Sequence, residues 1–150
     1  MATKVQRAKA ETKPEAIIND APRTFVDFPV GTVAHQGDVM FVRIASLPAG
    51  KPRKNRQLAD GTTQGSRHIL EGGEVFDCEP GEVARLIGQA CKGLNVDARY
   101  IGPVFRTKDT EADVVHPEHG DHCYRGQDWV IATVFQRSLD AEEREARVQD

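Results

Sequence analysis

The chain has 150 residues, with 20 Lys and Arg against 23 Asp and Glu and a net charge of -3. This length is typical of one domain that buries a core without metals or disulfides. The 39% hydrophobic and 29% charged residues exclude a collagen, a coiled coil along most of the chain and a fully disordered protein. No apolar run approaches the roughly 18 residues of a membrane span, and no secretory signal is visible. We therefore expect a cytoplasmic protein that no signal peptide directs to secretion.

The charges are distributed unevenly along the chain. Residues 1–70 carry 11 Lys/Arg and 6 Asp/Glu, whereas residues 71–150 carry 9 and 17. Opposite patches steer association, so this asymmetry favours head-to-tail contacts between subunits. The alternative is that the two halves of the sequence do not form separate faces in space.

The N-terminal residues are expected to form an extended polar arm over 1–23, because they include few apolar side chains and cannot bury enough surface to offset ordering. A short strand follows over 24–28 and ends at Pro29. The strongest strand pattern is the β-branched and aromatic run at 39–44, which turn residues precede.

A loop rich in glycine and proline is expected over 46–66, and loops of this length are usually functional or mobile. Two further strands are expected over 67–70 and 74–78. Gly72 and Gly73 lie between them and can supply the positive φ angles of a tight hairpin turn. The sequence therefore predicts that these two strands pair directly.

Apolar residues recur at helical spacing near 81–92, which predicts a packed helix that Gly93 can cap. A bent or edge strand is expected over 96–106, because a Gly-Pro pair interrupts it. Residues 107–128 are expected to be mostly loop, with a short strand over 113–116.

A second strong strand is expected over 129–135, apolar enough to be central in a sheet. Asp140 and Glu143 fit an N-terminal capping box for a charged helix over 139–150. We expect an α+β, mostly β fold with a β-sandwich or barrel-like core over 24–138, one packed helix, an N-terminal arm and a polar C-terminal helix.

The densest group of chemically active side chains is the segment 116–122, which holds three of the five histidines. Neutral imidazoles are favoured zinc ligands, and a distant strand can add a fourth. The candidate metal ligands are His116, His119, His122 and His68. His35 is a further candidate, and Glu118 is a candidate ligand or base. The alternative is a polar surface turn, since Pro-Glu-His-Gly is ordinary turn chemistry.

Four cations lie within six residues and attract phosphate groups. They are Lys51, Arg53, Lys54 and Arg56. No aromatic residue lies nearby to stack on nucleic acid bases. The segment is therefore a candidate for a phosphate or protein contact, with a solvated loop as the alternative.

The three cysteines cannot all pair within one chain, and no CxxC motif is present. Cys91 falls on the apolar face of the predicted helix, whereas Cys78 and Cys123 are candidates for an intermolecular disulfide. There is no phosphate-binding Gly-Lys-Ser/Thr loop and no G-x-S-x-G motif. We therefore expect no enzymatic activity and no cofactor, with zinc as the alternative.

Three segments together resemble an uncharacterised family of small β-rich proteins in bacteria and their phages. They are residues 37–50, residues 58–70, and residues 116–120 with the strand and charged helix that follow. The family's second segment has the pattern Gly-Glu-x-Thr-Gly-His-x-His, of which this chain retains the last histidine, His68. The resemblance implies a single-layer or barrel-like β core and a bacterial or phage setting, and it implies no established activity.

These observations favour a non-enzymatic assembly protein, a β-rich subunit that binds neighbouring protein subunits in a homo- or hetero-oligomer. A phage virion component, in the capsid, neck or tail, is the particular form we expect. The alternative is a cupin-like metal-binding protein or enzyme that uses the histidine segment. A third hypothesis is a nucleic-acid-associated protein that uses the basic segment. No membrane partner is expected.

Overall fold

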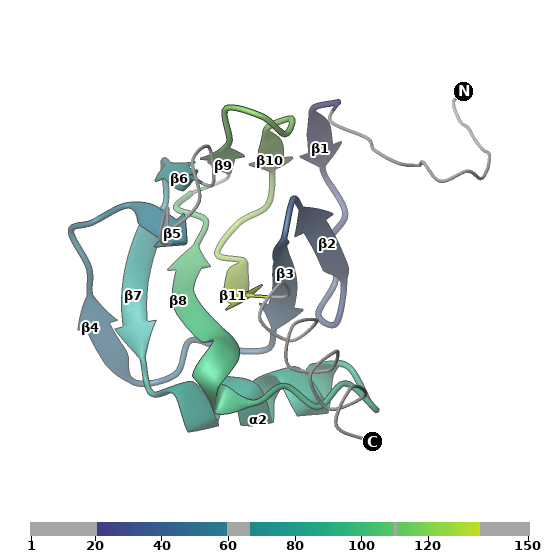
Figure 1. Cartoon of the computed structure of the whole chain (residues 1–150), viewed down its shortest axis with the longest axis vertical. Coiled ribbons are helices and arrows are strands. Elements are labelled where there is room, and N and C mark those ends of the chain that lie inside the picture. Colours follow the sequence, from purple (N-terminus) through teal and green to yellow (C-terminus); the bar gives the residue numbers. More distant parts are fainter. Residues whose placement is uncertain (1–20, 60–66, 110, 136–150) are drawn as a thin grey trace, which may run out of the picture.

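The computed structural model describes residues 21–59, 67–109 and 111–135, which form two β-sheets and a covering helix (Figure 1). Sheet A runs in the order β1 (Arg23–Phe25), β10 (His122–Tyr124), β9 (Ala112–Val115), β6 (His68–Glu71) and β5 (Gln57–Ala59). Sheet B runs in the order β2 (Val33–Gln36), β3 (Val39–Ile44), β11 (Val130–Phe135), β8 (Ile101–Arg106), β7 (Glu74–Cys78) and β4 (Gly50–Pro52). The helix is α2 (Pro80–Ala90), and a short 3-10 turn, η1, spans Ala98–Tyr100.

The two sheets face each other across an apolar core, which makes the fold a sandwich of the α+β, mostly β class. This inner core includes Phe41, Phe105, Tyr124 and Ile131, each fully buried. Within the described ranges the strands form two sheets rather than a single layer, and the predicted α+β, mostly β fold with a sandwich-like core and one packed helix is confirmed.

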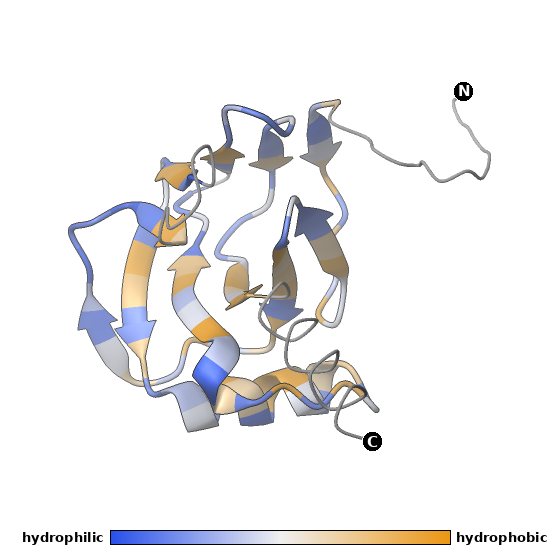
Figure 2. Ribbon diagram, in the orientation of Figure 1, coloured by the Kyte–Doolittle hydropathy of each residue, from blue (hydrophilic) through white to orange (hydrophobic). Residues whose placement is uncertain are grey.

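The second face of sheet B is covered by α2, so the described part has three layers. Val83, Leu86 and Ile87 of the helix are buried against the alternate residues of β3, such as Val42. In Figure 2 the hydrophobic residues gather on the central strands of sheet B and on α2, whereas β4 is mainly hydrophilic. The strong strands predicted at 39–44 and 129–135 are thus confirmed as neighbouring central strands, β3 and β11.

The helix predicted near 81–92 begins one residue earlier and ends sooner. The carboxylate of Glu79 accepts a hydrogen bond from the N–H of Glu82 (2.8 Å) and caps the N-terminus. Cys91 is the C-terminal cap, and its N–H donates to the carbonyl of Ile87 (2.8 Å). Gly93 has a positive φ of 89° but lies beyond this cap.

The Gly72-Gly73 turn has the positive φ angles that were predicted, 77° and 69°. The prediction that it closes a hairpin is wrong, because β6 pairs in sheet A and β7 pairs in sheet B. The turn instead carries the chain from one layer to the other. The physical reason is that each strand has partners elsewhere: β6 lies between β5 and β9, and β7 lies between β4 and β8.

Two segments predicted as loops contain short strands. Residues 46–66 include β4 and β5, and residues 107–128 include β10 as well as the expected strand at β9. These strands have three or four residues, so pairing with distant strands stabilises them rather than their own sequence pattern. The predicted arm lies almost wholly within residues 1–20, and the charged helix lies within 136–150; both are outside the described residues.

Alanine substitutions at Gly73, in the turn between the two sheets, and at Gly88, in the helix, test this account of the turn. A Cβ on Gly73 would lie 2.6 Å from the carbonyl oxygen of Arg106, at a φ of 69°, whereas a Cβ on Gly88 in α2 would meet nothing within 4 Å. We expect Gly73→Ala to lower the free energy of unfolding by about 2 kcal/mol or more. Gly88→Ala should raise it by about 1 kcal/mol. Urea unfolding followed by Trp129 fluorescence measures both, and equal effects at the two sites would contradict this account of the turn.

Candidate functional site

Histidines from β6 and from the β9–β10 connection meet at one end of the sandwich, beside the β2–β3 turn (Figure 1). The ring centroids of His68 and His116 are 4.4 Å apart, and those of His116 and His119 are 4.6 Å apart. His68 is 0% exposed and His116 is 6% exposed. The structure therefore joins three of the four histidines that the sequence singled out.

Gln36, which the sequence did not single out, fixes the protonation of His68. The Gln36 amide nitrogen donates to the carbonyls of Val114 (3.0 Å) and Gly120 (2.9 Å), which uses both of its N–H groups. The Gln36 amide oxygen lies 2.8 Å from Nδ1 of His68 and can only accept. His68 therefore carries its proton on Nδ1, and its Nε2 presents a lone pair.

His116 has the opposite arrangement. Its Nδ1 accepts the backbone N–H groups of Glu118 (3.0 Å) and His119 (3.1 Å), so the neutral ring carries its proton on Nε2. The imidazole thus stabilises its own turn, as an aspartate side chain often does. His119 lies over Gly37, where a Cβ would be 2.7 Å from its Cδ2 atom and the φ is 60°. Only glycine leaves room for the His119 ring there.

His122 belongs to the aromatic core rather than to this cluster of rings. It is 3% exposed, and its ring contacts Phe25 (5.5 Å) and Phe41 (6.2 Å). Its Nδ1 lies 3.4 Å from the hydroxyl of Tyr124. Burial, aided by Arg23 and neighbouring imidazoles, lowers the pKa of His122 to about 4, and burial raises the pKa of Tyr124.

His68 faces a carboxylate. Its Nε2 is buried, forms no hydrogen bond and lies 3.9 Å from Oδ1 of Asp38. Burial and then the neighbouring His116 lower the pKa of His68 to about 3, although Asp38 acts in the opposite direction. The imidazole is therefore neutral near pH 7 in spite of the adjacent carboxylate.

The sequence reasoning found the histidines and missed two of their neighbours. Gln36 and Asp38 flank Gly37 in the β2–β3 turn, and this polar turn between two apolar strands was the available signal. Glu118 and His35, the other candidates, have exposed side chains. Across residues 21–59, 67–109 and 111–135, no three His, Cys, Asp or Glu side chains converge closely enough to hold one metal ion.

The basic segment is divided between structural and solvent-exposed roles. The guanidinium of Arg56 donates to the carbonyls of Leu70 (2.7 Å), Gly72 and Gly73 (3.1 Å) and so holds the turn between the sheets. Arg53 lies 3.5 Å from Asp77. The remaining two cations, Lys51 and Lys54, are exposed.

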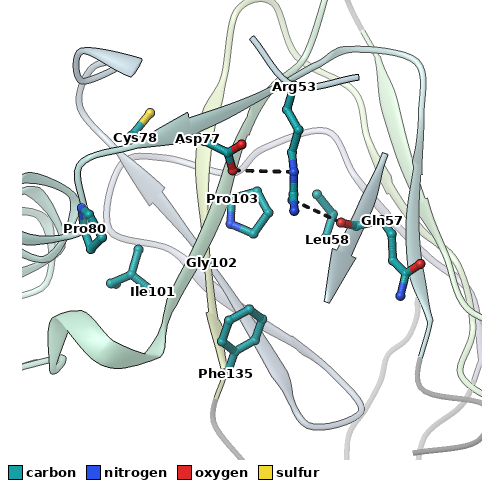
Figure 3. Close-up of a pocket in the computed structure, with 10 residues that line it drawn as sticks. All are labelled: Arg53, Gln57, Leu58, Asp77, Cys78, Pro80, Ile101, Gly102, Pro103 and Phe135. Atoms are coloured by element: carbon teal, nitrogen blue, oxygen red, sulfur yellow. Dashed lines mark hydrogen bonds and ion pairs between the residues drawn. The ribbon is translucent and has the colours of Figure 1, made fainter. Parts of the chain in front are cut away.

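A cavity of about 280 Å³ lies beside this segment and is drawn in Figure 3. The ion pair of Arg53 and Asp77 borders it, and Leu58, Phe135 and Cys78 contribute to its lining. Burial and the Asp77 carboxylate raise the pKa of the Cys78 thiol. Both effects disfavour the thiolate, which is the form that acts as a nucleophile.

All three cysteines are free and partly buried. Cys78 is in sheet B and Cys123 is in sheet A, at strands β7 and β10. Burial and Asp113 raise the pKa of Cys123, and burial raises that of Cys91, whose Sγ lies 3.2 Å from the carbonyl of Gly31. An intermolecular disulfide through Cys78 or Cys123 stays a prediction.

The different roles of the cations lead to a stability prediction. Arg56→Ala leaves three carbonyls without their donor, and we expect a loss of about 1–3 kcal/mol in the free energy of unfolding. Lys54→Ala should change it by less than about 0.5 kcal/mol. Chemical denaturation compares the two variants, and a neutral Arg56→Ala would show that the clamp does not stabilise the turn.

Buried neutral imidazoles also make stability depend on pH. Unfolded histidines bind a proton near pH 6.5, whereas folded His68 and His122 do so only near pH 3 and pH 4. Folding stability is therefore complete above pH 6.5 and falls as the pH is lowered toward 4. At pH 5 the loss is on the order of 2 kcal/mol per imidazole.

Urea unfolding at pH 7 and pH 5, in buffer with a chelator, measures this dependence. His122→Phe removes one imidazole from aromatic surroundings. It should therefore reduce the difference between the free energies of unfolding at pH 7 and at pH 5. A variant with the same pH dependence as the unsubstituted protein would refute the contribution of His122.

Residues 35–133 match the family described as Domain of unknown function (DUF8820). No curated protein and no solved structure matches the chain. In the part of the chain described by the structure, no helix has the length and apolar character to cross a membrane. The matched region contains the central strands, α2 and all five histidines, and the chain therefore belongs to the DUF8820 family.

Proposed function

We propose that this protein is a non-enzymatic assembly subunit that binds neighbouring protein subunits through β1 and the segment that follows it. The observation that carries the proposal is the exposure of apolar side chains beside an open strand edge. Val26, which directly follows β1, is 74% exposed, and Val30, four residues further along, is 45% exposed. Apolar groups that gather beside an unpaired edge are typical of surfaces that contact another protein.

The backbone of β1 supports this proposal. The N–H of Arg23 donates to the carbonyl of Asp121 (2.8 Å), and the carbonyl of Phe25 accepts from the N–H of Arg125 (2.9 Å). In a parallel ladder the intervening residue directs its own N–H and C=O to the other side. Thr24 therefore presents a donor and an acceptor away from β10, at the edge of sheet A. An extended segment of a neighbouring subunit can add to such an edge as a further strand.

The residues at both ends of β1 pack closely on the rest of the sandwich. A Cβ on Gly120 would lie 2.3 Å from the carbonyl carbon of Ala21, so the backbone of Ala21 packs directly on Gly120. On the inner side, the rings of Phe25 and Tyr124 stack at 5.1 Å. The edge is thus anchored to the sandwich, and among the residues that the structure describes no strand pairs with its outer side.

The uneven charge distribution along the sequence, with 11 Lys/Arg in residues 1–70 and 17 Asp/Glu in residues 71–150, also favours contacts with other subunits. The sequence resembles small β-rich proteins of bacteria and their phages, and this resemblance favours a phage particle as the assembly that contains the protein. We propose a phage particle, with the chain as a component of the capsid, neck or tail.

The edge can be tested without disturbing the fold. Thr24→Pro removes the outward N–H and leaves the bonds of Arg23 and Phe25 to β10 intact. We expect the unsubstituted full chain to form an oligomer and Thr24→Pro to shift it at least tenfold toward monomer. Thr24→Val keeps the N–H and should assemble normally, whereas Val26→Asp should dissociate the oligomer because it places a charge in the apolar contact.

Native mass spectrometry and light scattering give the mass of each species. A chain that stays monomeric at high concentration would contradict the proposal of self-assembly. An oligomer that persists in both Thr24→Pro and Val26→Asp would place the contact outside β1.

A further inference from the structure

His68 has the orientation of a metal ligand before any metal is bound. Histidines that bind metals nearly always donate the proton of one ring nitrogen to an oxygen, which fixes the tautomer and leaves the other nitrogen free to coordinate. In this protein Nδ1 of His68 donates to the amide oxygen of Gln36 at 2.8 Å. Gln36 is itself held by the carbonyls of Val114 and Gly120. Both the ring plane and the tautomer of His68 are therefore fixed.

The free nitrogen is in an unfavourable position unless a cation occupies the adjacent space. Its lone pair is buried and unpartnered, and it lies 3.9 Å from the carboxylate oxygen of Asp38. A lone pair and a carboxylate that face each other repel. A proton on Nε2 would relieve this repulsion, but burial and His116 oppose protonation of the ring near pH 7. A metal ion does not face the same obstacle, because it binds the neutral imidazole.

The separation of these two atoms is close to that required by one ion. Zinc binds imidazole nitrogen at about 2.0–2.1 Å and carboxylate oxygen at about 2.0–2.2 Å, so two ligands of a tetrahedral ion lie about 3.4 Å apart. The observed separation is 3.9 Å. The side chain of Asp38 is 35% exposed, so the pair is reached from solvent on the side of this carboxylate.

We propose that His68 Nε2 and Asp38 form a binding site for a divalent transition metal ion, with zinc as the best fit, and that Gln36 positions His68 for it. Water would complete the coordination of such an ion. His116 is not a ligand, because its Nδ1 accepts two backbone N–H groups and its Nε2 holds the proton. The proposal thus moves the metal site from the 116–122 segment to the pair formed by β6 and the β2–β3 turn.

This site is independent of the proposed subunit contact at β1. Matched substitutions of one carboxylate in each site distinguish the His68–Asp38 pair from the 116–122 segment. Asp38 is the carboxylate of the pair, and the exposed Glu118 is a carboxylate of the segment. Asp38→Asn keeps the size of the side chain and removes the negative charge, and Glu118→Gln makes the same change in the other segment. His68→Gln removes the ligand nitrogen, although it alters a buried position.

The experiment is titration of the full chain with Zn²⁺ by calorimetry, together with native mass spectrometry and the visible absorption of bound Co²⁺. We expect one zinc per chain, at least tenfold weaker binding in Asp38→Asn, loss of the Co²⁺ absorption in His68→Gln, and no change in Glu118→Gln. Thermal unfolding without metal checks that each variant is folded. The absence of stoichiometric zinc in the unsubstituted chain overturns the proposal, as does equal affinity in Asp38→Asn. Loss of binding in Glu118→Gln would assign the metal to the 116–122 segment instead.

Discussion

The central strands of sheet B must be covered on both faces, and the arrangement of the rest of the molecule depends on this requirement. Phe41 and Ile131 project to one side of the sheet, while Val42 and Val134 project to the other, and all four are 0% exposed. Sheet A covers the first face and α2 covers the second (Figure 1). Because the two sheets share a core but no strand, every connection between them crosses an end or a side of the sandwich.

Polar side chains join the layers at two places. Gln36 ends β2 in sheet B and donates to Val114 in sheet A, so one buried amide joins the two sheets. Arg56 holds the Gly72-Gly73 turn in the same way. Buried donors and acceptors are costly when unpaired and specify a single arrangement when paired. In the described residues, three buried side-chain polar atoms have no hydrogen bond: Nε of Arg43, Oγ1 of Thr133 and Nε2 of His68. Of these, Nε2 of His68 is the imidazole lone pair that faces a carboxylate.

Residues with similar sequence signals have different tasks in the fold. Among the histidines, His122 packs in the aromatic core, His116 stabilises its own turn, and His68 faces Asp38. Among the cations, Arg56 is bound by backbone carbonyls while Lys54 is exposed. The proposed metal pair and the proposed subunit contact at β1 also rest on separate residues. A cluster in the sequence is therefore a guide to where chemistry gathers, whereas the hydrogen bonds of each side chain decide what it can do.

The sequence by itself determined the long apolar strands β3 and β11, the helix α2 and the positive φ angles at Gly72 and Gly73, because periodicity, caps and glycine are local properties. It also located the histidines. It did not reveal the short strands β4, β5 and β10, since these depend on partners far along the chain. Only the tertiary structure decided that β6 and β7 belong to different sheets, that Gln36 fixes the tautomer of His68, and that Asp38 lies opposite its free nitrogen. These outcomes require residues far apart along the chain to meet, and no local pattern records such a contact.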